Sequence, residues 1–548
     1  ASIDLGNQTG DAMNFGTLTY NSAGAVSIAE DSATQLTGTN TAASLVLSSA
    51  GALSNTASAS LAVTNNANLS ATSIDLGNQA SDSMTFSTLT FNSGGAVNLA
   101  QDSATVLTGT STANSLVLSS TGSITDLAPS NLTVATTASF SGTSITLAES
   151  AGEVLTVCCN ASFTASGGGV ITLGGAGTAN FGSLTFNTTG PVTVNENSAT
   201  DLAGTSTAGT LTLTSSGAVT QSSGSVSVTG VTNLTATGNS ITVTSTTNDF
   251  GGLVNVTGGA TQITDKNTLA FGTISTGALT TINTGALDLG TGTITGTLTS
   301  TTNGGSITQT APLTVTGVVN LGTGASSTTG GAGSIALGAC TVSIAGSVSC
   351  TNTNDFQSVV NAAANGGISL SAANLLRPGT INAGSGIVIL KAATAGAIGT
   401  TGITSGGTVT AASGTFDSFN AVTNLDTQIS GNLLMTGNAS SFNLTGTTQP
   451  IAFNTTNANA NVFFNGACIG GPACGTVLLI TGSIGATVAQ IAAQALKDAQ
   501  STDSVAKQID YGFAGDVGTT PPMDHRIDET GISTPDCFEE SRENTACK

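Results

Sequence analysis

Apolar and polar residues alternate along most of the chain in short runs of three to five residues. Val-Ser-Ile at 26–28 and Leu-Thr-Val at 132–134 are examples. A period of two predicts β-strands that bury one face. Gly, Asn and Ser, which favour turns, separate the runs. No helical period occurs before residue 484, so the pattern predicts an all-β chain of short, evenly spaced strands.

The runs belong to longer repeats. The phrase "SIDLGNQ" occurs at 2–8 and again at 73–79. The segment "MNFGTLTYNSAGAVSIAEDSATQLTGTNTAASLVLSSAG" (13–51) recurs with substitutions at 84–122 and 179–217. Short strands broken by turns at a repeated spacing indicate a β-solenoid, in which each coil lays its strands on those of the coil below.

We therefore expect a long right-handed parallel β-helix of about 20 coils over residues 1–483, with super-repeats of about 71–96 residues. The 71-residue offset fits about three coils of roughly 22–25 residues. Ile3, Val26 and Leu45 should then stack, and Ile74 should begin the next cycle. The stretch 149–168, which contains "CCN", should be an insertion that bulges from one edge as a loop.

The strand pattern ends near residue 484. Residues 485–500 place apolar side chains on one stripe and predict an amphipathic helix, followed by a charged, Cys-containing tail. An open solenoid end exposes strand edges and core. The segment 484–548 should therefore either cap that end or dock onto another subunit. The candidate docking residues are Val488, Ile491, Leu496, Phe513 and Phe538.

Charge excludes several classes of partner. The chain has 8 basic and 29 acidic residues and a net charge of −21, and its first basic residue is Lys266. Nucleic-acid binding needs clustered Lys and Arg, and anionic membranes repel such a chain. Residues 475–496 carry no charge, but Gly482 and Gly485 interrupt them, so we expect no membrane insertion. Because Ala1 stands just before the repeated phrase, we expect a processed product or part of a longer protein.

The eight cysteines fall into four close pairs, which indicate local disulfides in an oxidising compartment. Buried free thiols are the alternative. A bridge between the adjacent Cys158 and Cys159 would be strained, so these two could bond to other partners. The candidate disulfide residues are Cys158, Cys159, Cys340, Cys350, Cys468, Cys474, Cys537 and Cys547.

Candidate chemistry is sparse, and we expect no enzyme, cofactor or metal. Catalytic β-helices need clustered carboxylates, whereas the acids here are isolated in sequence. The only histidine, His525, lies beyond the repeats, which rules out a Ser/His/Asp set within them. The pairs Asn248–Asp249 and Asn354–Asp355 should form Asx turns.

The segment 244–309, with its phrases "NDFGG", "ALDLG" and "GGSITQ", resembles the repeats of filamentous-haemagglutinin-type exoproteins. These are β-helical surface proteins of Gram-negative bacteria that are exported by two-partner secretion. The resemblance covers about residues 1–480. It implies an extracellular or cell-surface location on a Gram-negative bacterium.

Three functions follow as expectations. The first is a structural one, a self-associating surface fibre subunit or an adhesin shaft that polymerises head to tail. The second is an adhesive module that binds glycans or neighbouring cells through flat Thr/Asn faces or the loops 149–168 and 466–475. The third is ice binding through T-x-T arrays, although T-x-T does not recur regularly from coil to coil in the sequence.

Overall fold

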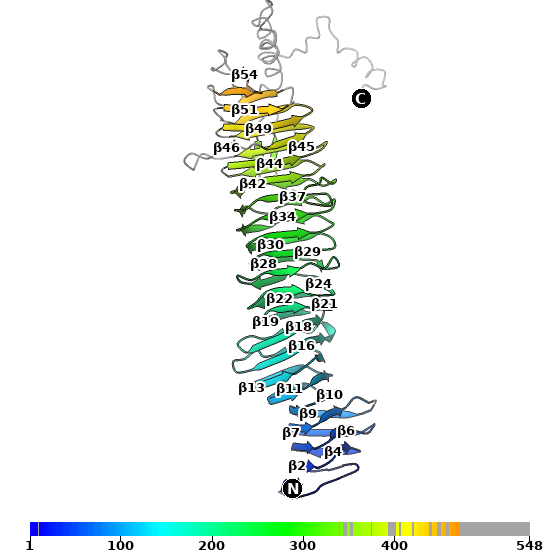
Figure 1. Cartoon of the computed structure of the whole chain (residues 1–548). Coiled ribbons are helices and arrows are strands. Elements are labelled where there is room, and N and C mark those ends of the chain that lie inside the picture. Colours follow the sequence, from blue (N-terminus) through cyan, green and yellow to red (C-terminus); the bar gives the residue numbers. More distant parts are fainter. Residues whose placement is uncertain are drawn as a thin grey trace, which may run out of the picture. The chain divides into compact units, whose positions relative to one another are not determined.

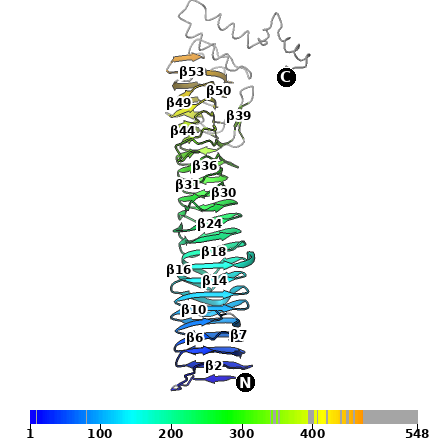
Figure 2. The same ribbon diagram turned by 90° about the vertical axis from the view of Figure 1, so that its right-hand side faces the viewer.

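The computed structural model describes residues 1–470, except residues 9, 80, 339, 343–347, 351–353, 374, 393–401, 405–406, 419–420, 438–440, 447–450, 456–459 and 466. The chain divides into two compact units, Ala1–Gly277 and Ala278–Lys548. Figures 1 and 2 show that the described part of each unit consists of short strands that stack in parallel from coil to coil. The expected parallel β-solenoid is therefore confirmed in each unit.

The first unit contains the strands β1 (Ile3–Leu5), β2 (Ala25–Glu30), β3 (Thr34–Leu36), β4 (Thr39–Ala42), β5 (Ser44–Ser49), β6 (Ala52–Asn55), β7 (Ser60–Ala71), β8 (Ser73–Leu76), β9 (Ser83–Ser93), β10 (Ala96–Gln101), β11 (Thr105–Ala113), β12 (Ser115–Ser120), β13 (Ile124–Val134), β14 (Ala138–Gly142), β15 (Ile145–Leu147), β16 (Val154–Ala165), β17 (Ile171–Leu173), β18 (Thr178–Asn187), β19 (Pro191–Glu196), β20 (Thr200–Leu202), β21 (Thr205–Ala208), β22 (Thr210–Ser215), β23 (Val219–Gln221), β24 (Ser225–Val228), β25 (Thr232–Ala236), β26 (Ile241–Val243), β27 (Asp249–Phe250), β28 (Leu253–Gly258), β29 (Thr261–Thr264) and β30 (Leu269–Thr276). A 3-10 turn, η1 (Ser166–Gly168), follows β16.

The second unit contains the strands β31 (Leu279–Ile282), β32 (Leu287–Asp288), β33 (Thr291–Ile294), β34 (Leu298–Thr301), β35 (Ile307–Thr308), β36 (Leu313–Val315), β37 (Val319–Gly322), β38 (Ile335–Leu337), β39 (Cys340–Val342), β40 (Val348–Cys350), β41 (Asp355–Phe356), β42 (Val359–Ala363), β43 (Ile368–Ala372), β44 (Leu375–Asn382), β45 (Ile387–Ala392), β46 (Gly402–Thr404), β47 (Thr408–Ala411), β48 (Ser413–Ser418), β49 (Ala421–Ile429), β50 (Leu433–Gly437), β51 (Ser441–Gly446), β52 (Ile451–Thr455), β53 (Asn461–Phe464) and β54 (Ala467–Gly470).

The predicted stacking of the first three coils is confirmed. Ile3 lies opposite Val26, and Val26 lies opposite Leu45, in parallel ladders of β1, β2 and β5. The next residue of this column is Ala67 of β7, and not Ile74. Ile74 lies in another column, between Leu53 and Val97. The prediction for Ile74 is therefore wrong, because three coils use fewer residues than one 71-residue offset.

Copies of the super-repeat consequently alternate between two sides of the solenoid. The phrase "SLVLSS" forms β5 on the ladder that contains β2 and β7. Its second copy, β12, joins the ladder of β8, β10 and β14 instead. The third copy, β22, returns to the first side through β19, β17, β15 and β13. One super-repeat therefore advances the chain by a whole number of coils plus about half a coil.

The core of the first unit is a set of apolar columns. Strand residues alternate between buried and partly exposed, as in the pattern of Ser44–Ser49. Phe140 and Phe163 are fully buried and stacked, with ring centroids 4.9 Å apart, and Phe181 meets Phe163 edge to face at 5.6 Å. Buried aromatic and aliphatic area is the main stabilising term for such a fold.

In the second unit, β31, β34, β37 and β42 form one parallel ladder, and β38, β43, β45 and β48 form another. Two pairs depart from this arrangement. The strands β39 and β40 pair antiparallel, as do β53 and β54. The predicted helix at 485–500 and the tail after it lie outside the described residues.

Candidate functional surfaces

The outer face carries aligned files of hydroxyl groups. On five successive coils the outward residue at one strand position is threonine, each in register with the next. We call this set the threonine file; its members are Thr125, Thr146, Thr172, Thr193 and Thr212. Asn233 and Asn255 continue the same column, and the Asn255 amide donates to the Asn233 side-chain oxygen at 2.9 Å. Although T-x-T is irregular in the sequence, this single column is regular over five coils.

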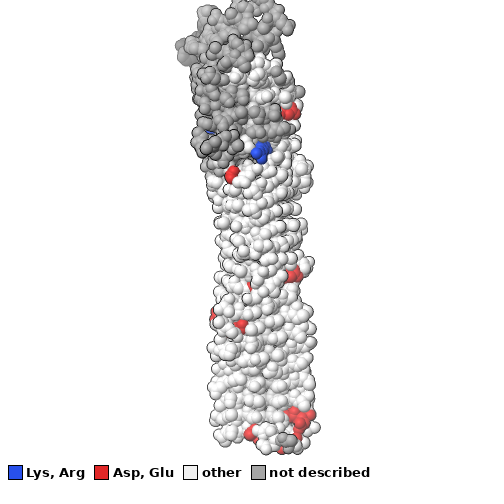
Figure 3. Space-filling model, turned by 60° about the vertical axis from the view of Figure 1, so that its left-hand side comes forward, with Lys and Arg blue, Asp and Glu red and all other residues white. Residues whose placement is uncertain are grey.

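Charged groups are widely spaced on the described surface. Figure 3 shows one face, on which small acidic patches are separated by uncharged residues. Lys266 pairs with Asp249 at 2.9 Å, and this contact lowers the pKa of the Asp249 carboxyl. Lys391 pairs with Asp417 at 2.7 Å. Within the described residues, no three His, Cys, Asp or Glu side chains converge in a way that could hold a metal ion.

Several acidic residues lie inside the fold and were not expected there. They share one position, 15 residues after the Phe of the phrases "MNF", "MTF", "ANF" and "NDF". Glu30 Oε1 accepts the N–H of Phe15 at 2.8 Å, and Glu196 Oε1 accepts that of Phe181 at 2.9 Å. In a continuous parallel ladder, a backbone carbonyl of the neighbouring strand would accept the N–H of each Phe. Here the side-chain carboxylate accepts it instead.

At the other two of these positions, the side chain also hydrogen-bonds to the backbone of the Phe 15 residues earlier, but the groups involved differ. Asp265 accepts the N–H of Phe250 at 3.4 Å. Gln101 instead donates from Nε2 to the carbonyl of Phe86 at 2.9 Å. A neutral amide thus occupies one of four equivalent positions. The four residues Glu30, Gln101, Glu196 and Asp265 are each no more than 3% exposed.

Burial affects the ionisation of these carboxyls. Loss of hydration raises the pKa of Glu196, and it raises the pKa of Asp265 to about 6. Burial also raises the pKa of Asp126 to about 6, although the carboxylate accepts the N–H of Ala148, and the charges of Glu153 and Glu149 add to the rise. These three carboxyls therefore hold their protons more tightly in the folded chain than in the unfolded one.

Replacing Asp265 by Asn should make the protein more stable at pH 7 and leave it unchanged at pH 4. A carboxyl whose folded pKa is raised contributes stability below its unfolded pKa of about 3.9, and this contribution is lost as the pH rises through about 6. Urea unfolding of both chains between pH 4 and pH 7.5 measures the difference. Asp249→Asn is the control, and it should make the protein less stable at pH 7, because Lys266 lowers the pKa of Asp249. An Asp265→Asn chain that is less stable than wild type at pH 7 would contradict this assignment.

The expected Asx turns at the two "TNDF" phrases are wrong. Asn248 is fully buried, and its side-chain oxygen accepts the N–H of Val226 from the preceding coil at 2.8 Å. The side-chain oxygen of Asn354 likewise accepts the N–H of Leu313 at 2.9 Å. Both side chains bond between coils rather than locally, because they point into the core next to a buried Phe.

The prediction that residues 149–168 form a loop is also wrong. Residues 154–165 form β16, which pairs with β14 on one side and with β18 on the other. Cys158 and Cys159 lie in this strand, where the register with β18 shifts between Val157 and Asn160. Both are exposed free thiols, with their sulfurs 3.6 Å apart. The bridge considered for this pair is therefore not formed here.

Three other candidate cysteines lie in described strands. Cys340 and Cys350 are direct partners in the antiparallel pair of β39 and β40. This register brings their backbones together as a local bridge requires, and the bridge itself stays a prediction. Cys468 lies in β54, opposite Phe463. The remaining candidates lie outside the described residues: Cys474, Cys537, Cys547, Val488, Ile491, Leu496, Phe513 and Phe538.

Among the described residues, the structure contains no helical segment with the length and hydrophobicity of a membrane span. The uncharged stretch 475–496 is outside that part.

Comparison with known proteins gives one match. The family model "Repeats of unknown function (DUF5649)" matches residues 189–257 and 276–363. The two segments cover less than half of the chain, and the described residues within them form coils of the solenoid. No curated protein and no solved structure matches the chain. This chain is thus similar, over those two segments, to a family of repeats whose function is unknown.

Proposed function

We propose that this protein is structural, and that its solenoid serves as the shaft of an extracellular surface fibre or adhesin. The observation that supports the proposal is the run of parallel ladders with buried apolar columns within each unit. Each coil is hydrogen-bonded along its strands to the coils next to it, which resists bending and leaves few places for a protease to enter. The proposal assigns no catalytic activity.

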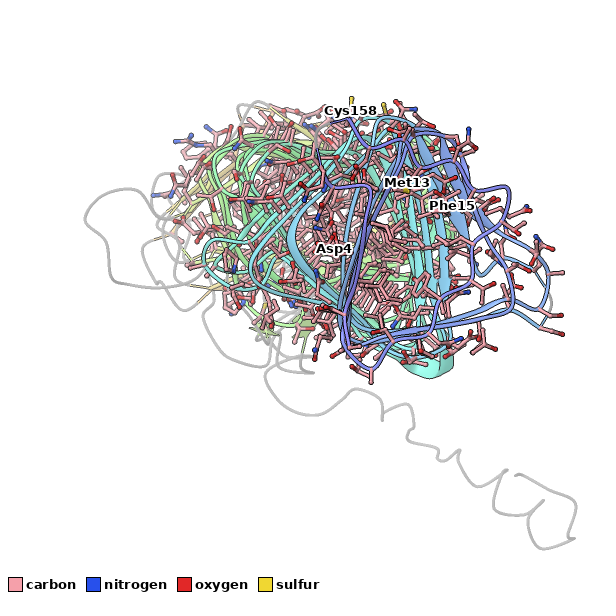
Figure 4. All side chains as sticks on the ribbon, turned by 90° about the horizontal axis from the view of Figure 1, so that it is seen from below. Asp4, Met13, Phe15 and Cys158 are labelled. Carbon is pink, nitrogen blue, oxygen red and sulfur yellow. The ribbon has the colours of Figure 1, made fainter. Side chains whose placement is uncertain are left out.

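The proposal includes self-association by extension of the strand ladder. The end strand of an open ladder presents unpaired backbone groups, and a head-to-tail contact that does not close on itself produces a filament. Within the described residues β1 pairs with β2 alone, and Leu5 at its end is 38% exposed. Figure 4 looks onto this end, where Asp4, Met13 and Phe15 are labelled.

We expect wild-type protein to associate as its concentration rises, and Leu5→Lys to prevent this by placing a charge on β1, the outermost strand of its ladder within the described residues. Sedimentation velocity over a hundredfold range of concentration, with electron microscopy of the same samples, measures both. Leu127→Lys is the matched control, because Leu127 is 57% exposed and lies away from the end. A wild-type chain that stays monomeric throughout, or a Leu5→Lys chain that associates like wild type, overturns end-to-end assembly.

A second candidate function is adhesive binding to glycans, and the regular threonine file supports it. Aligned hydroxyls at the coil spacing can hydrogen-bond repeating sugars, and the same surface could order water on ice. The triple variant Thr146→Val, Thr172→Val, Thr193→Val keeps the strand shape and removes the hydroxyls. Loss of binding on a glycan array would support adhesion, and a thermal-hysteresis measurement on the same pair of proteins tests ice binding. If the variant matches wild type in both assays, the threonine file is not a binding surface.

A further inference from the structure

The adjacent thiols of Cys158 and Cys159 lie on the same side of their strand, which a regular strand does not allow. Successive side chains of a β-strand point to opposite faces. Here β16 has one more residue than β18 between two paired positions, since Val157 pairs with Phe181 and Asn160 pairs with Ser183. This β-bulge turns both cysteines outward. Figure 4 shows Cys158 at the rim of the cross-section.

The bulge is held by its neighbours. The side-chain oxygen of Asn160 accepts the hydroxyls of Ser183 and Thr185 at 3.1 and 3.3 Å. Gly182 lies directly against the bulge, because a Cβ at that residue would be 2.1 Å from the carbonyl oxygen of Cys158. The positions of the two thiols are therefore set by fixed contacts on β18.

The same framework occurs elsewhere without cysteine. In β7 the register with β9 shifts between Val63 and Asn66, and Asn66 accepts the hydroxyls of Thr88 and Thr90. Thr64 and Asn65 occupy the two exposed positions there. The bulge is thus a feature of the repeat, and the thiols are an addition to one copy of it.

Geometry makes a bond between these thiols possible but easily reduced. The sulfurs are 3.6 Å apart, so a modest rotation brings them to bonding distance. Adjacent Cα atoms are about 3.8 Å apart, which is below the roughly 4.4–6.8 Å usual for disulfides. Strained, exposed disulfides are the ones that exchange readily. The Cys159 thiol hydrogen-bonds to the Cys158 sulfur, and this contact raises the pKa of Cys159.

We propose that Cys158 and Cys159 form an exposed dithiol that exchanges reversibly with low-molecular-weight disulfides. One of the two sulfurs, as a thiolate, attacks the external disulfide, forms a mixed disulfide and releases one external thiolate. The other thiol of the pair then gives up its proton and displaces the second external thiolate, which closes the Cys158–Cys159 bond. The two thiols lose two electrons and two protons in all, and the external disulfide becomes two thiols.

The test uses the full chain in buffers with different ratios of reduced to oxidised glutathione, followed by alkylation and mass spectrometry of the peptide with residues 158–159. The expected result is an intramolecular bond that forms only in oxidising buffers and opens when reduced glutathione is in excess. The variants Cys158→Ser and Cys159→Ser should retain bound glutathione, with about tenfold more mixed disulfide than wild type.

A matched variant tests whether the geometry of the bulge, and not the sequence around Cys158 and Cys159, is what allows the exchange. In a chain with Cys158→Ser and Cys159→Ser, the changes Thr64→Cys and Asn65→Cys place two thiols on the equivalent bulge of β7, and the same exchange is expected there. Three results would each overturn the proposal: a bond that persists in excess reduced glutathione, wild type that accumulates mixed disulfide as the single variants do, or bonds formed only between chains.

Discussion

Replacing Phe163 by Ala should lower the free energy of unfolding by about 3–5 kcal/mol. The Phe163 ring is fully buried, stacks on Phe140 at 4.9 Å and meets Phe181 at 5.6 Å. Its backbone lies in the middle of a ladder, with Phe140 on one side and Phe186 on the other. Coils above and below are hydrogen-bonded to β16, so the gap cannot close without breaking their register.

Urea unfolding followed by circular dichroism measures the effect, and Phe163→Leu is the matched control. Leucine keeps most of the buried volume and should cost less than about 1.5 kcal/mol. The difference between the two variants isolates the contribution of the ring volume. A Phe163→Ala chain as stable as wild type would mean that this column is not a packed core.

The second large effect is expected at Gly77, which follows the last residue of β8. Its φ is +79°, and a Cβ there would be 2.2 Å from the carbonyl oxygen of Ala100 in the next coil. Gly77→Ala should therefore cost about 2 kcal/mol or more, from left-handed strain together with steric overlap. The equivalent turn after β15 holds Ala148 at φ +59°. Strain alone is thus tolerated, and the contact with Ala100 is what makes Gly77 the more sensitive position.

Thermal unfolding of Gly77→Ala and of Gly94→Ala provides the comparison. A Cβ added at Gly94 would have no atom within 4 Å, and the backbone there is not left-handed, so its substitution should be neutral within about 0.5 kcal/mol. Equal melting temperatures for the two variants would show that coils are not packed as closely as the ladder of β8 and β10 requires.

The solenoid was predictable because two independent signals agreed. The alternation of apolar and polar residues predicted strands such as β2 and β5. The recurrence of 13–51 at 84–122 showed that these strands belong to a regular array. The position of Ile74 was not predictable in the same way. Coil length depends on how many residues each turn takes, and these differ between coils, so a fixed repeat length does not give a whole number of coils.

The error at 149–168 has a different origin. The two cysteines followed by Asn160 interrupt the alternation of apolar and polar residues, which looks like the end of a strand. A β-bulge produces the same interruption while the strand continues. The phrase "LAVTNNANL" at 61–69, which matches "LTVCCNASF" at 155–163, contained the signal that both are strands.

The buried carboxyls were missed because charged residues are ordinarily placed on the surface. The available signal was spacing. Glu30, Gln101, Glu196 and Asp265 each follow a Phe by 15 residues. An acid or amide that recurs at one fixed distance from a Phe indicates a structural role. The net charge of the chain does not reveal this role, and neither does the fact that each acid is isolated in the sequence.

The most direct test of the stacked coils is disulfide cross-linking between outward positions of neighbouring coils, in a chain with Cys158→Ser and Cys159→Ser. Ser27 and Val46 are register partners on β2 and β5, so Ser27→Cys with Val46→Cys should cross-link efficiently within one chain under mild oxidation. Val46 and Val117 occupy the same position in two copies of the super-repeat but lie in different ladders, and their cysteine variants should not cross-link. Failure of the first pair, or efficient linkage of the second, would contradict the stacking of coils on which the proposed shaft depends.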